Sequence, residues 1–155
     1  MRVTICAVGR LRSGPEKALI DDYLDRFGKT GRALSLGPAQ ITEVEAKKGG
    51  QAAEAELLQR AVPTGAALIC LDERGKMLSS PDFAATLARF RDTGRQELVL
   101  AIGGADGHTP EMRARADLLL SFGPMVWPHM LARAMLAEQL YRAAQILAGT
   151  PYHRV

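Results

Sequence analysis

The stretch ELVLAIGGADGH (97–108) indicates the fold class, because an apolar run passes directly into a glycine-rich turn. Its first half, ELVLAI (97–102), is apolar at odd and even positions alike, and so is AALICLD (66–72). Strands that are apolar on both faces are typical of a parallel sheet covered by helices on both sides. We therefore predict an α/β protein with a parallel sheet flanked by helices, whose ligands bind at the carboxyl ends of the strands.

The remaining segments alternate between strand and helix patterns, as this class requires. The expected strands cover residues 1–9, 32–41, 66–72, 97–102 and 116–122. The expected helices lie between Ser13 and Gly28, over 51–62, between Ser80 and Gly94, after Thr109, and over about 130–148. No repeat and no linker interrupts this order, so we predict a single domain over residues 1–155.

The first expected helix has a strong pattern of its own. Ser13 and Glu16 have the spacing of a capping box, and Gly28 marks the expected end of the helix. Apolar residues recur along one face, which predicts that they are buried in the core: Leu19, Ile20, Tyr23, Leu24 and Phe27.

Composition excludes several classes of protein. The chain is 47% hydrophobic and 24% charged, which is typical of a folded domain. Its longest apolar runs are about six residues long, whereas a membrane-spanning helix needs about 20. The N-terminus has no basic segment followed by an apolar one, so we expect a cytoplasmic protein without a membrane partner.

Cysteine and histidine usage argues against a metal centre. Cys6 and Cys70 lie in separate apolar runs without a CxxC motif, so we expect both to be buried, reduced thiols. Three histidines, two of them near the C-terminus, are too few to indicate a metal site.

The charge of the chain permits an acidic partner. The net charge is +3, and 15 of the 20 cationic residues are arginine. Arginine binds phosphate through two hydrogen bonds and stacks on bases, which favours nucleic acid. A GC-rich genome gives the same bias, and both interpretations remain open.

Three loops are expected at the carboxyl edge of the sheet, over residues 71–76, 102–108 and 121–129. The middle loop lacks the G-x-G-x-x-G spacing of dinucleotide sites and the lysine of a P-loop, so it is not a standard phosphate site. The last loop contains Met125, Val126 and Trp127, where a surface turn is usually polar. These side chains suit a flat aromatic group such as adenine, or pack on the core or a second subunit.

The last helix and the tail carry a second set of polar residues. His129 and Arg133 lie one turn apart, and Glu138 and Arg142 are spaced for a helical ion pair, which is usually an exposed feature. The tail residues 152–154 form either a frayed end or a contact with a base and its phosphate.

Five segments occur in the order and near the spacing of one known family. They are LDERGK (71–76), IGGADG (102–107), WPHMLAR (127–133), AEQLYRA (137–143) and PYHR (151–154). Together they closely resemble the ribosomal large subunit methyltransferase H family, a small member of the SPOUT class. The resemblance covers the whole chain, is densest from residue 66 onward and is weakest over 30–65.

This resemblance implies a parallel sheet whose C-terminal part forms a trefoil knot, a homodimer, and S-adenosylmethionine as methyl donor without a metal. The implied reaction is methylation of N3 of a pseudouridine in the 23S ribosomal RNA of assembled ribosomes. The positions that match the family's cofactor contacts are Leu71, Gly103, Gly104, Phe122, Gly123, Pro124, Met125, Val126 and Trp127. We expect the glycines to let the backbone approach the ligand. Gly123-Pro124 departs from the small polar residues common in relatives.

The reaction removes a proton from N3, which calls for a base or a group that stabilises negative charge. The candidate catalytic residues are His129, His153 and Arg154. The candidate RNA contacts are Arg133, Arg142, Tyr152, His153 and Arg154. His129 acts either as the base or as a support of the pocket, and the tail of one chain can complete the pocket of another.

Lys47 and Lys48, in a glycine-containing loop, either contact the ribosome or are simply solvated. Two other functions compete with the enzyme. One is a ribosome-binding module that keeps the fold without catalysis. The other is a nucleotide-binding α/β protein, against which the missing P-loop lysine and the apolar third loop argue.

Overall fold

The computed structural model describes residues 1–154 and contains one five-stranded sheet. The strands are β1 (Arg2–Val8), β2 (Ala39–Val44), β3 (Ala67–Lys76), β4 (Glu97–Ile102) and β5 (Leu118–Leu120), in the spatial order β2-β1-β4-β3-β5. Every neighbouring pair is parallel. This confirms the parallel sheet predicted from the apolar runs. Val155, the last residue of the predicted tail, lies outside the described residues.

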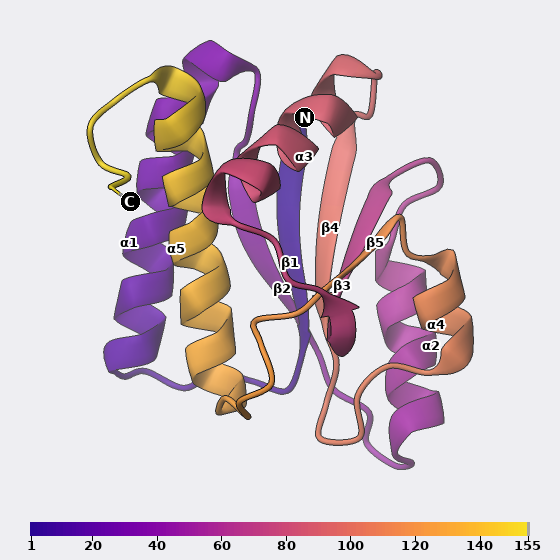
Figure 1. The fold of residues 1–155 in the computed structure, drawn as a ribbon. Helices are drawn as coiled ribbons and strands as arrows, with labels where there is room; N and C mark the ends of the chain where they lie inside the picture. The colour runs from indigo at the N-terminus through magenta and orange to yellow at the C-terminus, as the bar shows by residue number, and fades with distance from the viewer. Residues whose placement is uncertain (155) are drawn as a thin grey trace.

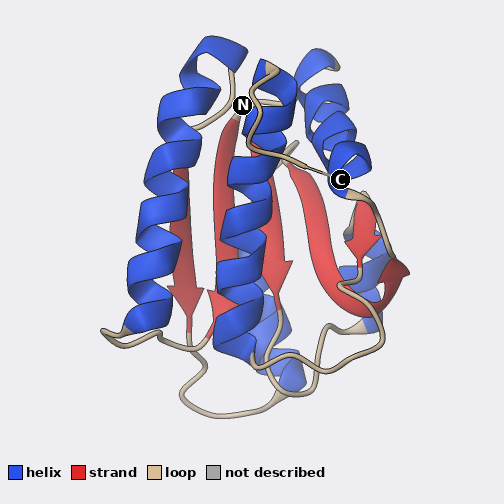
Figure 2. Ribbon diagram, turned by 60° about the vertical axis from the view of Figure 1, so that its left-hand side comes forward, coloured by secondary structure: helices blue, strands red, loops and turns tan. Residues whose placement is uncertain are grey.

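Helices cover both faces of the sheet (Figures 1 and 2). One face carries α1 (Pro15–Gly31), α3 (Ser80–Asp92) and α5 (His129–Ala148). The other face carries α2 (Gln51–Ala61) and the short α4 (Pro110–Arg115). A 3-10 turn, η1 (Arg32–Leu34), follows α1.

The central strand β4 explains why the sheet is apolar on both sides. Leu98 and Leu100 point into the core under α1, α3 and α5, whereas Val99 and Ala101 point into the core under α2 and α4. All four are at most 2% exposed. Because both faces of β4 are buried, its sequence is apolar throughout and does not alternate between apolar and polar residues.

The two cysteines are buried and free, as predicted. Both lie in the core under α2 and α4. Burial raises the pKa of Cys6 to about 11 and that of Cys70 to about 12. Both thiols therefore stay protonated at neutral pH and act as small apolar side chains.

Several predicted boundaries are wrong. α1 has Gly14 at its N-cap without a side-chain cap, so the capping box does not form, and the helix continues past Gly28 to Gly31. Leu19 is 47% exposed, so the first helix buries a narrower stripe than its spacing suggested. Ser79 caps α3, one residue before the predicted Ser80, whereas Thr109 caps α4 as predicted.

Two strands also differ from the prediction. The second strand begins at Ala39 rather than at residue 32, because η1 and a loop occupy 32–38. β3 continues through the predicted turn to Lys76, which pairs with Leu120 of β5. A Cβ on Gly75 would lie 2.5 Å from the carbonyl carbon of Leu119, so only glycine allows this crossing.

The loop after β5 leads back across the sheet toward α5 (Figure 1). The trefoil knot implied by the family resemblance stays a prediction for this segment. Within residues 1–154, no helix combines the length and the hydropathy that a bilayer crossing requires.

Candidate functional site

Three loops meet in a cleft of about 810 Å³ at the carboxyl ends of β3, β4 and β5. They are the three loops that the sequence placed at this edge. The cleft brings together eight of the nine residues expected to contact a cofactor: Leu71, Gly103, Gly104, Phe122, Gly123, Met125, Val126 and Trp127. Pro124, although it lies between two of them, is not part of the lining.

The loop after β5 gives the cleft an apolar rim. Met125 is 72% exposed, Val126 is 91% exposed and Trp127 is 42% exposed. The start of this loop is held by Ser121, whose Oγ accepts a hydrogen bond of 3.1 Å from the backbone N–H of Gly123. The rim therefore presents hydrophobic side chains to solvent, which is unusual in a surface loop.

The glycine-rich wall is shaped by its own backbone. A Cβ on Gly103 would lie 3.0 Å from the carbonyl carbon of Gly107, because the loop folds back on itself there. A Cβ on Gly104 would collide with the carboxylate of Glu54 in α2. At Gly103, admitting a ligand is thus only part of the reason for glycine, since the backbone of the loop itself leaves little room for a Cβ; at Gly104 the obstacle is the end of a flexible side chain.

The cleft also contains charged residues that the sequence interpretation missed. Carboxylates outnumber guanidinium groups in the lining, which includes Glu54, Asp72, Glu73, Asp106, Arg74 and Arg113. The Asp72 side chain is 7% exposed and lies 3.8 Å from Arg113. Asp72 and Glu73 follow directly after an apolar run, which was an available signal, whereas Glu54 comes from α2 and gave none.

His108 is a second missed residue of the cleft lining. Its side chain is buried, and its Nε2 lies 3.2 Å from the carbonyl oxygen of Ala101. Its Nδ1 has no hydrogen-bond partner within residues 1–154. Burial lowers the pKa of His108 below its usual value. In the neutral ring Nε2 donates to the carbonyl oxygen of Ala101, so Nδ1 is a buried acceptor without a hydrogen-bond partner in the described residues.

His129 stands at the first position of α5 and bonds to the glycine loop. Its Nε2 lies 2.8 Å from the carbonyl oxygen of Gly103, and Arg133 Nε lies 3.3 Å from its Nδ1. Burial, followed by the nearby guanidinium, lowers the pKa of His129. Both ring nitrogens of His129 are therefore engaged by groups of the protein itself.

Arg133 is fully buried, at 2% exposure. Its other donors reach the Glu43 carboxylate at 2.7 Å and the carbonyl oxygens of Val8 and Gly9 at 2.8 Å each. Four of its five N–H donors are bonded within the protein, and the side chain is 2% exposed, which argues against the prediction that Arg133 contacts RNA.

The tail is folded back onto α5 and is not frayed (Figure 1). The Tyr152 hydroxyl donates to Glu138 at 3.0 Å, and its ring packs edge-on against Tyr141 at 4.7 Å between centroids. Arg142 donates to Glu138 at 2.6 Å and stands 4.8 Å above the Tyr152 ring. The Glu138–Arg142 pair is therefore part of a half-buried cluster and is not a solvated ion pair.

His153 completes this tail cluster, and Arg154 beyond it is exposed. Arg142 NH1 lies 3.1 Å from His153 Nδ1. Arg142 is 13 positions after His129 on the same helix, which corresponds to roughly 20 Å along the axis. Within one chain, the structure therefore does not bring the tail and the cleft together.

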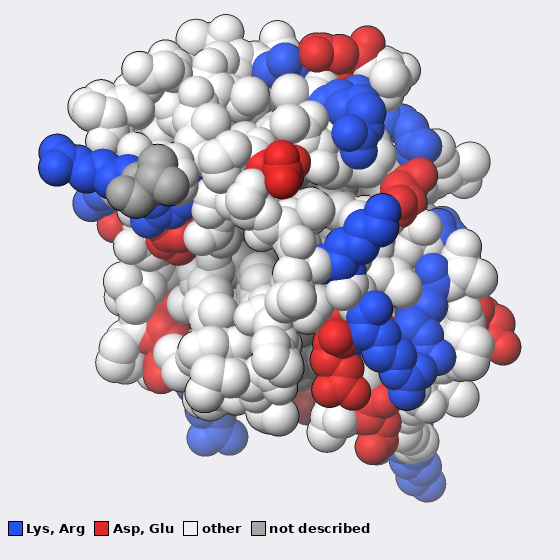
Figure 3. Space-filling view, viewed as in Figure 1, with Lys and Arg blue, Asp and Glu red and all other residues white. Residues whose placement is uncertain are grey.

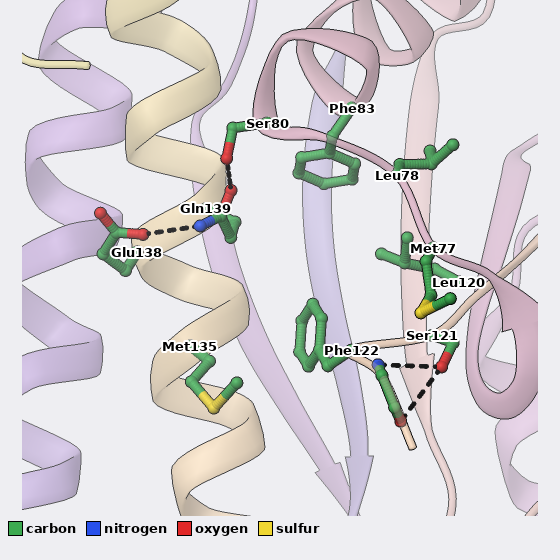
Figure 4. A pocket seen from close by; sticks show the side chains of 11 residues that line it. Met77, Leu78, Ser80, Phe83, Leu120, Ser121, Phe122, Met135, Glu138 and Gln139 are labelled. Carbon is green, nitrogen blue, oxygen red and sulfur yellow. Dashed lines mark hydrogen bonds between the residues drawn. The ribbon is translucent and has the colours of Figure 1, made fainter. Parts of the chain in front are cut away.

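A second, smaller cavity of about 410 Å³ lies between α3 and α5 (Figure 4). Met77, Phe83, Phe122 and Met135 point into it. Along one side, Ser80 donates to Gln139, which in turn donates to Glu138. The segment 120–123 lines both this cavity and the cleft, so the two spaces share one wall.

In the view of Figure 3, most of the visible cationic side chains lie on the right-hand side, with acidic side chains among them. They lie over the region of β5 and α4, whereas the surface between α5 and β3 is largely uncharged in this view. Lys47 and Lys48 are exposed in the loop between β2 and α2.

A comparison of the sequence with known protein families shows which family the chain belongs to. The family model described as "Predicted SPOUT methyltransferase" matches residues 1–153. The chain belongs to the SPOUT methyltransferase family. This confirms the resemblance that the five segments carried.

Two full-length relatives of this SPOUT methyltransferase bear the same name. The Ribosomal RNA large subunit methyltransferase H of Ruegeria pomeroyi is 70% identical over 156 aligned residues, which cover 100% of both chains. The protein of the same name from Dinoroseobacter shibae is 67% identical with the same coverage. Among solved structures, a probable methylase family protein from Haemophilus influenzae Rd KW20 is similar in fold, with a TM-score of 0.54 and 10% identity over 99% of this chain and 70% of that chain.

Proposed function

We propose that this chain is an S-adenosylmethionine-dependent methyltransferase that acts on N3 of a pseudouridine in the 23S ribosomal RNA of assembled ribosomes. The observation that carries this proposal is the 70% identity, over the whole of both chains, with a Ribosomal RNA large subunit methyltransferase H. The cleft supports it, because its lining comes from the segments that resemble the cofactor contacts of that family. The chain then acts as one methyltransferase domain over residues 1–155, in the cytoplasm where ribosomes work.

The charge of the cleft suits a cationic cofactor. Four of its lining residues carry carboxylates and two carry guanidinium groups. S-adenosylmethionine has a positive sulfonium, whereas a nucleoside triphosphate is strongly anionic and would be repelled by excess carboxylates. This difference argues against the nucleotide-binding alternative.

We assign the cofactor to Leu71, Gly103, Gly104 and the segment 122–127. The apolar side chains of 125–127 suit the adenine ring, and backbone N–H and C=O groups of the same segment can orient it. Bound S-adenosylmethionine supplies an electrophilic methyl group and requires no metal. The main task of these residues is to hold that group in line with the attacking nitrogen.

We assign substrate contacts to the tail cluster of Arg142, Tyr152 and His153, together with Arg154. Arginine only donates hydrogen bonds, so Arg142 makes His153 Nδ1 an acceptor and leaves the proton of the neutral ring on Nε2. In this tautomer His153 donates from Nε2, which suits stabilisation of the negative charge that develops as N3 loses its proton. Arg154, exposed beside it, can bind a phosphate. Lys47 and Lys48 are proposed as further phosphate contacts.

We also propose a homodimer in which the tail of one chain reaches the cleft of the other. The roughly 20 Å between Arg142 and His129 along α5 favours this over a site within one chain. A cluster of exposed apolar side chains next to the cleft offers an interface: Met125, Val126, Trp127, Met130 and Leu131. Analytical ultracentrifugation tests it, since Met130→Asp and Leu131→Asp together should yield a monomer without activity.

The experiment that tests the proposed function is transfer of a labelled methyl group from S-adenosylmethionine to ribosomes lacking this modification. We expect one methyl group per ribosome, in 23S RNA, and mass spectrometry of the digested RNA should find it on N3 of a pseudouridine. Isolated 23S RNA should be a poor substrate. Ribosome binding without any transfer would contradict the enzyme and support the non-catalytic module.

A further inference from the structure

His129 and Arg133 occupy the place where three strands and one helix meet. Arg133 bonds to the ends of β1 and β2 through Val8, Gly9 and Glu43, and His129 bonds to Gly103 at the end of β4. Both side chains project from the first turns of α5, which follows directly after the rim of the cleft. Two walls of the cleft are thus connected through these two residues.

The protonation state of this pair follows from hydrogen-bond chemistry. A guanidinium has only donors, so the bond from Arg133 Nε makes His129 Nδ1 an acceptor. The neutral ring then carries its proton on Nε2, where it donates to the carbonyl oxygen of Gly103 at 2.8 Å. A protonated ring would lose the bond from Arg133 and place two cations side by side.

The anchor behind Arg133 is well defined. Glu43 accepts from Arg133 at 2.7 Å and from the backbone N–H of Leu11 at 2.5 Å. Its carboxylate is therefore also held by the loop between β1 and α1, and it balances the charge of the buried guanidinium. The resulting chain of bonds runs from Glu43 through Arg133 and His129 to Gly103.

We propose that Arg133 and His129 are positioning residues that fix the Gly103 carbonyl and the start of α5 relative to each other, and thereby set the shape of the cofactor cleft. His129 does not act as the base. This inference rests on the proposed function, since it takes the cleft as the site of S-adenosylmethionine. The two residues then affect the affinity for the cofactor, and they take no part in proton transfer or RNA binding.

Two substitutions of one residue separate positioning from proton transfer. His129→Gln keeps an N–H donor near the place of Nε2 but cannot act as a base, whereas His129→Leu removes the donor. We expect His129→Gln to keep the Kd for S-adenosylmethionine and the single-turnover rate within about threefold. We expect His129→Leu to raise that Kd about tenfold, while the rate at saturating cofactor falls less. A general base would instead cost both variants about 100-fold or more in rate.

The tautomer gives a readout that needs no cofactor. In nitrogen-15 NMR spectra of the wild-type protein at pH 7, His129 should be neutral and protonated on Nε2, and Arg133→Lys should alter its Nδ1 shift. An Nδ1-protonated or charged ring would overturn the inference. So would equal cofactor affinity of His129→Leu and the wild type, or loss of turnover in His129→Gln. If the wild type itself fails to bind S-adenosylmethionine, the proposed function fails, while the NMR result still decides the bonding of the pair.

Discussion

Two arginines of α5 each face a histidine, but in different surroundings, and only the first histidine belongs to the helix. At the start, Arg133 donates to Nδ1 of His129, and at the far end Arg142 faces Nδ1 of His153. The first guanidinium is 2% exposed, and the second side chain is 24% exposed. Nε2 of His129 is used by Gly103, whereas Nε2 of His153 has no partner in residues 1–154.

This difference assigns the two pairs to different tasks. A ring whose two nitrogens are both satisfied inside the protein can hold a loop but has nothing to offer a substrate. A ring with one N–H left over can still bind a substrate oxygen. The identity of the residues is the same at both ends, so the task depends on burial and on the partner of the second nitrogen.

The largest expected effect concerns folding. Arg133→Met removes the donors to two backbone carbonyl groups and leaves the Glu43 carboxylate with only the N–H of Leu11, which should cost about 3 kcal/mol of unfolding free energy. Thermal unfolding should show a Tm lowered by about 6–12 °C. The matched control, Arg142→Met, should cost about 1 kcal/mol or less. If both variants lost the same unfolding free energy, the two His–Arg pairs would not differ in their contribution to stability.

The next effect concerns catalysis. His153→Ala removes the proposed donor to the substrate and should lower the single-turnover rate of ribosome methylation about 100-fold. The Kd for S-adenosylmethionine, measured by calorimetry, should stay within about twofold, because His153 is assigned to the substrate, whereas the residues assigned to the cofactor all belong to the glycine loop and the loops after β3 and β5. A large change in cofactor affinity with an unchanged rate would reverse the assignment of the two histidines.

A smaller effect is expected in the glycine wall. Gly103→Ala brings a Cβ against the backbone of Gly107, so the loop must shift, and the Kd for S-adenosylmethionine should rise about tenfold. Gly104→Ala is the control, since its Cβ meets the end of the flexible Glu54 side chain, which can move away. If the control weakens binding more than Gly103→Ala does, the loop geometry is not what limits affinity.

The smallest effect is a pH dependence of stability. The pKa of His129 is lowered by burial and by Arg133, and that of His108 mainly by burial, with Asp72 and Arg113 nearby. The unfolded chain then binds more protons than the folded one below about pH 6.5, so stability is full above that pH and falls below it. The Tm of His129→Gln should fall less between pH 7.5 and pH 5.5 than the wild-type Tm. An equal fall would show that His129 does not contribute.

The sequence predicted the sheet and the cleft because their signals are local. The runs 66–72 and 97–102 are apolar on both faces, and only a covered parallel strand explains that. Since parallel strands end at one edge, the loops that follow them had to meet. Helix ends were harder to predict from the sequence. Gly28 resembles the end of a helix, but α1 continues through it to Gly31, because tertiary packing outweighs the low helix propensity of one glycine.

The role of Arg133 could not be predicted, because its partners come from distant parts of the chain. Glu43 lies 90 positions away and Val8 lies 125 positions away. In the sequence, His129 and Arg133 are simply two polar residues four apart, as Glu138 and Arg142 are. The spacing gives no sign that Arg133 is fully buried and that the Glu138–Arg142 pair contacts the tail.

The most direct test of the account is a calorimetric titration of the wild-type protein with S-adenosylmethionine and, separately, with ATP. We predict saturable binding of S-adenosylmethionine and none of ATP, with affinity reduced in Gly103→Ala and His129→Leu but kept in His153→Ala. Binding of ATP in preference, or cofactor binding that depends on His153 and not on Gly103, would contradict the assignment of this cleft.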